Sequence, residues 1–245
     1  MSMDTVRFVK SDFSYPHLEE AASEIASFLY EYRSPVIIRT FIEFMRVNIR
    51  ITLKNYKPFT DKFFSKVIKN RRKAPPDLLQ LEKLCNRLFE ACESDDEIIK
   101  MRGLIPEKLF EMIFEKRHHG KNCNIGYGAK VLINGKVIEY QPKKPFKTED
   151  DSDQPRKTID AGFWDGDFGE FVEIKLSPLA FQTKEIKYLK LLESELQKDD
   201  LPHTIFLVAL ENKDLIKHRL KRLNLYYDNF VLVGKEELFD LEKAS

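Results

Sequence analysis

The chain has 245 residues, of which 42% are hydrophobic and 33% charged, a balance that argues against disorder, and its net charge of +1 indicates no partner. Its longest apolar run, residues 205–210, is far below the about 20 residues that a membrane-spanning helix needs. The first ten residues lack a secretory signal pattern, and the three cysteines lack the CxxC spacing of a zinc site. The sequence therefore predicts a cytoplasmic protein with no membrane partner.

The amino-terminal third of the chain is predicted to be helical. Apolar residues recur there at helical spacing, from about residue 15 to residue 72. The sequence Lys-Ala-Pro-Pro-Asp at 73–77 ends this pattern, because proline disfavours helix for the residue before it. We therefore expect a helical section over residues 1–76 and a second domain, of α/β type, over residues 77–245.

The helical section carries an excess of positive charge. Between residues 33 and 73 there are twelve Lys or Arg residues, against only Glu43 and Asp61. Such a segment suits a polyanion, and it equally suits a solvated surface, because the sequence does not show whether the charges share a face. If the partner is such a polyanion, the residues that we expect to contact its phosphates are Arg71, Arg72 and Lys73.

The second domain is predicted to mix helices and strands. Asn134-Gly135 between two β-prone runs is a strong hairpin signal. A charged, proline-rich loop at 141–156 precedes a second hairpin with strands at 157–164 and 170–176. The other expected elements are helices at 77–92, 105–117, 183–196, 214–222 and 236–243 and strands at 204–210 and 229–233. This order predicts an α/β fold with a mixed central sheet flanked by helices.

The second hairpin places chemistry-bearing residues on one face. Alternate side chains of a strand point the same way, so Glu173 and Lys175 emerge together while Ile174 points to the opposite face. If the turn uses the four residues 165–168, Asp160 lies opposite Glu173 with its carboxylate on the same face. A slip of one residue would turn Asp160 away.

Two carboxylates and an ammonium on one face suit a hard divalent cation and an attacking water. Magnesium prefers oxygen ligands, usually one or two carboxylates completed by water and substrate phosphate. A bound cation would lower the pKa of its water and offset charge on the transition state of phosphodiester cleavage. Lys175 would orient the nucleophile or contact the scissile phosphate without binding the metal.

The order Ile159-Asp160, twelve residues, Glu173-Ile174-Lys175, then a helix and an apolar strand resembles the PD-(D/E)xK nuclease superfamily over about residues 102–233. Isoleucine stands here where the motif has proline. The resemblance implies a restriction-endonuclease-like core, in which Asp160, Glu173 and the carbonyl of Ile174 bind Mg²⁺ or Mn²⁺. It also implies that Lys175 assists catalysis.

The same resemblance suggests further residues at the site. The family often adds an acidic residue from the preceding helix, for which Glu107 is our choice, with Glu111 and Glu115 as rivals that would equally form a solvated helical stripe. Gln182 and Lys184, at the start of the next helix, occupy positions that would contact substrate phosphate. They would equally serve as capping and surface residues.

The sequence thus predicts a metal-dependent nuclease that hydrolyses phosphodiester bonds, with DNA as the expected substrate. The helical section would help to bind substrate, a second copy of the chain or another subunit. Two alternatives remain open. One is a nuclease-fold module that binds nucleic acid or protein without turnover, and the other is a nuclease directed at RNA.

Overall fold

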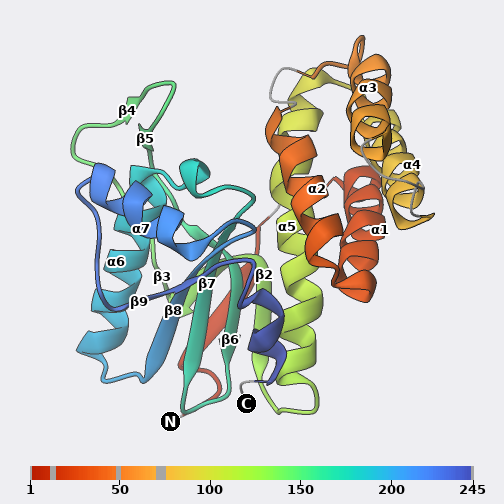
Figure 1. Cartoon of the computed structure of the whole chain (residues 1–245). Helices are drawn as coiled ribbons and strands as arrows, with labels where there is room; N and C mark the ends of the chain where they lie inside the picture. The colour runs from red at the N-terminus through yellow and green to blue at the C-terminus, as the bar shows by residue number, and fades with distance from the viewer. Residues whose placement is uncertain (1, 12–14, 48–50, 70–75, 244–245) are drawn as a thin grey trace. The chain divides into compact units, whose positions relative to one another are not determined.

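The computed structural model describes residues 2–11, 15–47, 51–69 and 76–243, and the chain divides into two compact units. The helical unit comprises residues 14–112, and the sheet unit comprises residues 1–13 together with 113–245. The boundary expected near residue 76 lies inside the helical unit. Arg71, Arg72 and Lys73 lie outside the described residues, as Figure 1 shows by its grey trace.

Over its described residues the helical unit contains five helices in chain order, and the last of them continues into the sheet unit. Each packs through an apolar stripe, as in α1, where Leu18, Ile25 and Leu29 are fully buried. The helices are α1 (Pro16–Tyr32), α2 (Pro35–Val47), α3 (Tyr56–Lys69), α4 (Pro76–Glu90) and α5 (Asp95–His118).

Helix α5 is longer than the sequence predicts. We expected it to begin near residue 105, with Pro106 in its first turn, but it begins at Asp95 and contains Pro106. Its first turn carries Asp95, Asp96 and Glu97, which complement the positive end of the helix dipole. No helix among the described residues is long and apolar enough to cross a membrane.

The sheet unit is built on a mixed seven-stranded sheet with the order β1-β2-β6-β7-β8-β9, and β3 pairs with β2 at its side. Pairing is antiparallel from β1 through β7 and parallel from β7 through β9. The expected α/β fold with a mixed central sheet is therefore confirmed. The strands are β1 (Val6–Lys10), β2 (Asn124–Ile133), β3 (Lys136–Val137), β6 (Thr158–Trp164), β7 (Gly169–Lys175), β8 (His203–Ala209) and β9 (Phe230–Val233).

Strand β1 lies at the start of the section 1–76 that the sequence predicts to be helical, before the helical spacing that begins near residue 15. Its five residues pair with β2 over their whole length, from Val6 opposite Ile133 to Lys10 opposite Ala129. The amino terminus thus contributes an edge strand to the sheet.

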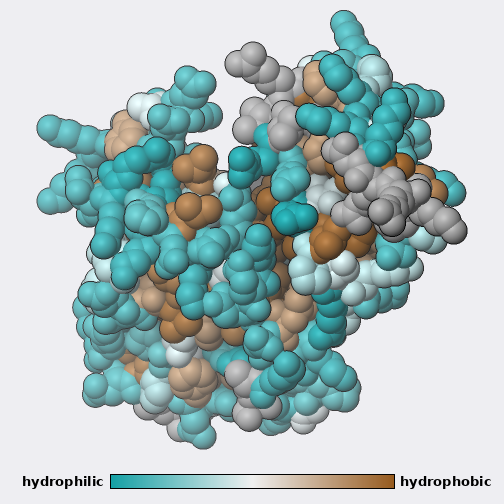
Figure 2. Space-filling view, viewed as in Figure 1, coloured by the Kyte–Doolittle hydropathy of each residue, from teal (hydrophilic) through white to brown (hydrophobic). Residues whose placement is uncertain are grey.

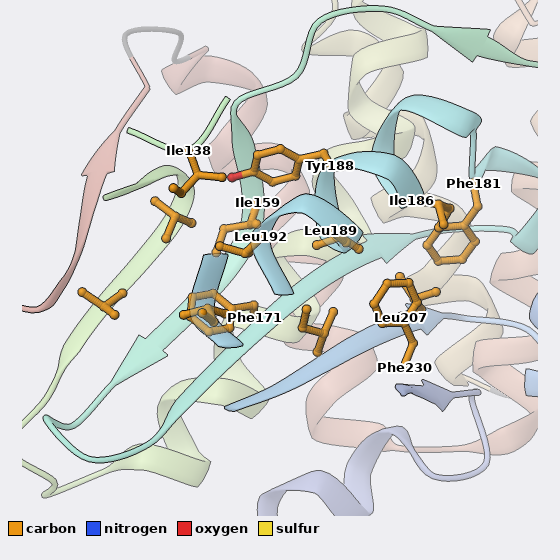
Figure 3. Packing of buried hydrophobic residues seen from close by; sticks show 14 of the residues in the cluster. Ile138, Ile159, Phe171, Phe181, Ile186, Tyr188, Leu189, Leu192, Leu207 and Phe230 are labelled. Carbon is orange, nitrogen blue, oxygen red and sulfur yellow. The ribbon is translucent and has the colours of Figure 1, made fainter. Parts of the chain in front are cut away.

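Helices α6 (Thr183–Lys198) and α7 (Lys213–Arg222) complete the sheet unit, in which one hydrophobic cluster joins helices and strands. Figure 3 shows Tyr188 of α6 beside Ile138 and Ile159, with Phe171 and Leu207 of the sheet in the same cluster. Hydrophilic side chains cover most of the face of this unit seen in Figure 2. The last element is a 3-10 helix at Leu238–Lys243, where the sequence predicts an ordinary helix.

Both predicted hairpins are present. Strands β2 and β3 turn at Asn134 and Gly135, whose φ angles of 48° and 78° suit the tight turn that Asn-Gly predicts. The expected loop at 141–156 instead contains a two-stranded ladder of β4 (Phe146–Lys147) and β5 (Ser152–Asp153).

Candidate functional site

The register of the hairpin β6–β7 agrees with the one inferred from the sequence. Ala161 pairs with Val172 and Trp164 with Gly169, so four residues, 165–168, form the turn. Continued by one step, this register sets Asp160 beside Glu173. The carboxylate of Asp165 accepts hydrogen bonds from the backbone N–H groups of Asp167 (3.0 Å) and Phe168 (2.8 Å), so it stabilises the turn.

The three expected side chains meet. Lys175 Nζ lies 3.3 Å from Asp160 Oδ2 and also donates to Glu173 Oε1. Glu173 is fully buried, and the side chains of Asp160 and Lys175 keep 11% and 18% of their exposure. Ile174, 1% exposed, packs in the core as the alternation of β7 predicts.

The backbone carbonyl oxygen of Ile174 lies on the same side of β7 as the carboxylate of Asp160. The N–H of Ile174 donates to Asp160 Oδ2 at 2.7 Å, whereas the carbonyl of Lys175 accepts from Leu210 N on the opposite side of β7. The N–H and carbonyl of one strand residue point to the same side, so the Ile174 carbonyl faces the edge where Asp160 lies.

Sequence reasoning missed Arg156, which is central to the site. Its Nη2 donates to both carboxylate oxygens of Glu173 at 2.7 Å and lies 3.4 Å from Asp160 Oδ1. Its backbone pairs with Tyr140 in both directions, at 2.8 and 3.1 Å. The only signal in the sequence is that Arg156 precedes Asp160 by four residues, at the end of a segment expected to be a loop.

The first turn of α6 supplies a third carboxylate that was also missed. Glu185, 3% exposed, lies 3.6 Å from Arg156 Nη1 and accepts a hydrogen bond from Gln182 N at 2.9 Å. Gln182 is thus the residue that caps α6, and Lys184 Nζ lies 3.8 Å from Glu185. Both residues fit the capping and surface role that was the alternative to substrate contact.

The two metal-ligand candidates differ in their tendency to ionise. Burial raises the pKa of Asp160, but Lys175, Arg156 and the Ile174 N–H outweigh it, so the pKa falls below its ordinary value. Burial also acts on Glu173 and, with the neighbouring Asp160, raises its pKa to about 7 despite Arg156 and Lys175. Like charges this close separate in pKa, so Asp160 is the firmly ionised member.

Lys175 stays protonated in this setting. Burial lowers the pKa of its ammonium group, but Asp160 and Glu173 outweigh that effect and raise it above the ordinary value. The same two carboxylates raise the pKa of Arg156 against its burial. Lys175 can therefore donate a hydrogen bond or supply positive charge, and it is unsuited to act as a base.

The donor set fits one hard divalent cation in outline. A single cationic atom, Arg156 Nη2, already lies within 3.4 Å of oxygens from both Asp160 and Glu173. The carbonyl of Ile174 faces the same edge, and magnesium commonly binds through one or two carboxylates with water for the rest. Over the described ranges, no group of three or more His, Cys, Asp or Glu residues is arranged to hold a metal ion.

The other predicted residues are not part of the contacts just described. Glu107 and Glu111 lie on the part of α5 that belongs to the helical unit, where Glu111 pairs with Lys108 at 2.8 Å. Glu115 lies on the part of α5 in the sheet unit and is exposed. The choice among these three as a further ligand stays a prediction.

Comparison with family models gives no match, and comparison with curated proteins gives none either. Among solved structures, the crystal structure of protein VC1899 from Vibrio cholerae is similar, with 13% sequence identity and a TM-score of 0.47. The match covers 98% of this chain and 57% of that one, so the chain spans little more than half the length of VC1899.

Proposed function

We propose that the chain is a metal-dependent nuclease that hydrolyses phosphodiester bonds, with DNA as its substrate. One observation carries the proposal: the carboxylates of Asp160 and Glu173 share two cationic partners, the guanidinium group of Arg156 and the ammonium group of Lys175. Burying charged groups costs desolvation free energy, and apolar residues of similar volume often stabilise a fold equally well. Stability alone therefore gives little reason for a buried cluster of this kind. Asp160 and Lys175 keep 11% and 18% of their side-chain exposure, which suits contact with a cation, water or substrate.

Each residue has a defined role in this proposal. Asp160, Glu173 and the Ile174 carbonyl would hold Mg²⁺ or Mn²⁺, which when bound supplies an activated water and charge stabilisation at the phosphate. The Ile174 N–H fixes the carboxylate of Asp160 in place. Lys175, protonated and 18% exposed, donates to the attacking water or to a phosphate oxygen.

A binding module without turnover is the second candidate, and one observation favours it. Arg156 Nη2 donates to both oxygens of Glu173 at 2.7 Å. This arrangement suits an ion pair that only stabilises the fold as well as it suits a metal site without its metal. An RNA substrate is also compatible with the site, because the chemistry at phosphate does not select the sugar.

The proposal includes a nucleic-acid contact by the helical unit and a cytoplasmic setting. Exposed lysines on α3 at positions 62, 66 and 69 have the spacing of one helix face, which suits a phosphate backbone. The three cysteines are unpaired, which suits a reducing compartment. The same unit could instead dock a second copy of the chain.

The test is a cleavage panel. Purified protein is incubated with linear, circular and single-stranded DNA and with RNA, in Mg²⁺ or Mn²⁺, beside Asp160→Ala and Lys175→Ala variants. Asp167→Asn is the control, because Asp167 is an exposed acid in the turn of the same hairpin. Cleavage that needs Asp160 and Lys175 but not Asp167 supports the proposal, whereas activity that survives the first two substitutions refutes it.

A further inference from the structure

Arg156 occupies the position that a divalent cation would need. Its Nη2 bonds both oxygens of Glu173 and lies 3.4 Å from Asp160, so it uses the lone pairs that would otherwise bind a metal ion. Lys175 differs, because it lies on β7 two residues after Glu173, and it contacts one oxygen of Glu173 and one of Asp160 on β6. Arg156 and a cation therefore exclude each other at Glu173.

Arg156 also forms an ion pair with a third carboxylate. Glu185 Oε1 lies 3.6 Å from Nη1, on the first turn of α6. The backbone of Arg156 is held to Tyr140 by two hydrogen bonds, so a change of partner from Glu173 to Glu185 requires only side-chain rotation. Its Nε is buried and has no hydrogen-bond partner among the described residues, so its donors are not all used in the present arrangement.

The charge of the cluster favours such a change. A cation would bind Glu173 in its ionised form, and if all three carboxylates are counted as ionised and Arg156 and Lys175 as protonated, the five groups sum to one negative charge. A divalent cation would turn this into one positive charge and repel the guanidinium from Glu173. A planar guanidinium released beside such a site matches the geometry of a phosphate group.

We propose that Arg156 is an exchangeable counter-ion: it holds Glu173 in the metal-free protein, moves to Glu185 when a divalent cation takes Asp160 and Glu173, and there binds the substrate phosphate. This inference rests on the proposed function, because it takes these two carboxylates as the metal ligands. It predicts that Arg156 has two opposite effects on binding. Arg156 weakens cation binding and strengthens substrate binding.

The first measurement is Mn²⁺ binding, followed by the electron paramagnetic resonance signal of the free ion. Arg156→Gln removes the competing charge, so its dissociation constant for Mn²⁺ falls about tenfold or more below that of the wild type. Arg156→Lys keeps the positive charge but lacks the planar guanidinium group, so its dissociation constant for Mn²⁺ lies between those of the wild type and Arg156→Gln. Arg222→Gln, the same change at an exposed position of α7, leaves the constant unchanged.

The second measurement is the binding of a fluorescein-labelled single-stranded DNA in Ca²⁺, by anisotropy. Arg156→Gln binds the DNA about fivefold to tenfold more weakly, because a charge-assisted phosphate contact is lost. Arg222→Gln is again the control. Circular dichroism confirms that each variant is folded, and Arg156→Lys carries the test if the glutamine variant is not.

The outcomes separate the two proposals. Tighter Mn²⁺ binding together with weaker DNA binding supports the exchange, and a purely structural arginine would weaken both. If the wild type cleaves DNA with Mn²⁺ but Arg156→Gln binds the ion no more tightly, the exchange is wrong and the nuclease stands. If neither protein binds Mn²⁺ and neither cleaves DNA, the nuclease proposal fails and the exchange fails with it.

Discussion

Replacing Glu170 by glutamine removes a buried charge that anchors the strand carrying Glu173 and Lys175. Glu170 is 3% exposed and accepts hydrogen bonds from Arg117 Nη2 at 2.6 Å and Nε at 3.0 Å. His118 Nε2 lies 2.9 Å from Glu170 Oε2, the oxygen that also accepts from Arg117 Nε. The substitution leaves Arg117, whose side chain is 12% exposed, without its ionic partner.

The expected loss is about 3 kcal/mol at pH 7, the lower end of the range for removing one partner of a buried ion pair. The lower end applies because glutamine still accepts a hydrogen bond and Arg117 also donates to the carbonyl of Leu241 at 2.7 Å. A chain of this size loses about 2–4 °C of Tm per kcal/mol, so Tm should fall by about 6–12 °C.

The loss should also depend on pH. Although burial raises the pKa of Glu170, its hydrogen bonds with His118 and Arg117 outweigh burial and hold the pKa below its ordinary value. A carboxyl with a depressed folded pKa stabilises the protein above its unfolded pKa of about 4.3, and the contribution is lost as pH falls through the folded value. The difference between wild type and Glu170→Gln should therefore shrink below pH 4.

Urea unfolding followed by the fluorescence of Trp164 measures this effect in the sheet unit, because Trp164 is the only tryptophan and is fully buried in β6. Glu236→Gln is the matched control, since the Glu236 side chain is 51% exposed. A Glu170→Gln protein as stable as the wild type at pH 7, or a difference unchanged at pH 3.5, would refute the reasoning.

Three further predictions concern packing, capping and charge. Gly162→Ala places a Cβ atom 2.3 Å from Phe8 and 2.7 Å from Ile159, so we expect a loss of about 1–3 kcal/mol in urea unfolding, and an unchanged midpoint would contradict the packing. Asp151→Ala removes the carboxylate that accepts from Thr183 N (2.7 Å) and Oγ1 (2.6 Å) at the start of α6, which should cost about 1 kcal/mol by the same assay. The third change replaces three lysines of α3 by glutamine, at Lys62, Lys66 and Lys69. The slope of the logarithm of the single-stranded DNA binding constant against the logarithm of salt concentration should become shallower by about two units, and an unchanged slope would exclude this face as a phosphate contact.

The two hairpins and the core of the site could be predicted because local patterns determine them. The alternation of Glu173, Ile174 and Lys175 sets which side chains share a face, and the turn after Trp164 sets the register of Asp160. Asn134-Gly135 likewise specifies its own turn. These features depend on residues within one hairpin.

What the sequence did not reveal depends on distant contacts. Arg156 lies near Glu173 while its backbone pairs with Tyr140, sixteen positions earlier in the sequence, and Glu185 joins through the packing of α6. Strand β1 pairs with β2 across more than a hundred residues, a pairing that no local period indicates. Helix α5 begins at Asp95 and continues through Pro106, whereas the sequence pattern had suggested that Pro106 marks the first turn.

The most direct test of the account is the single-turnover rate of DNA cleavage as a function of Mg²⁺ concentration, for the wild type, Asp160→Asn and Asp167→Asn. The account predicts that the wild-type and Asp167→Asn rates rise to the same plateau. It predicts that Asp160→Asn is slower by about a hundredfold or more at every concentration. Cleavage that is independent of Mg²⁺, or an Asp160→Asn rate equal to that of the wild type, would contradict it.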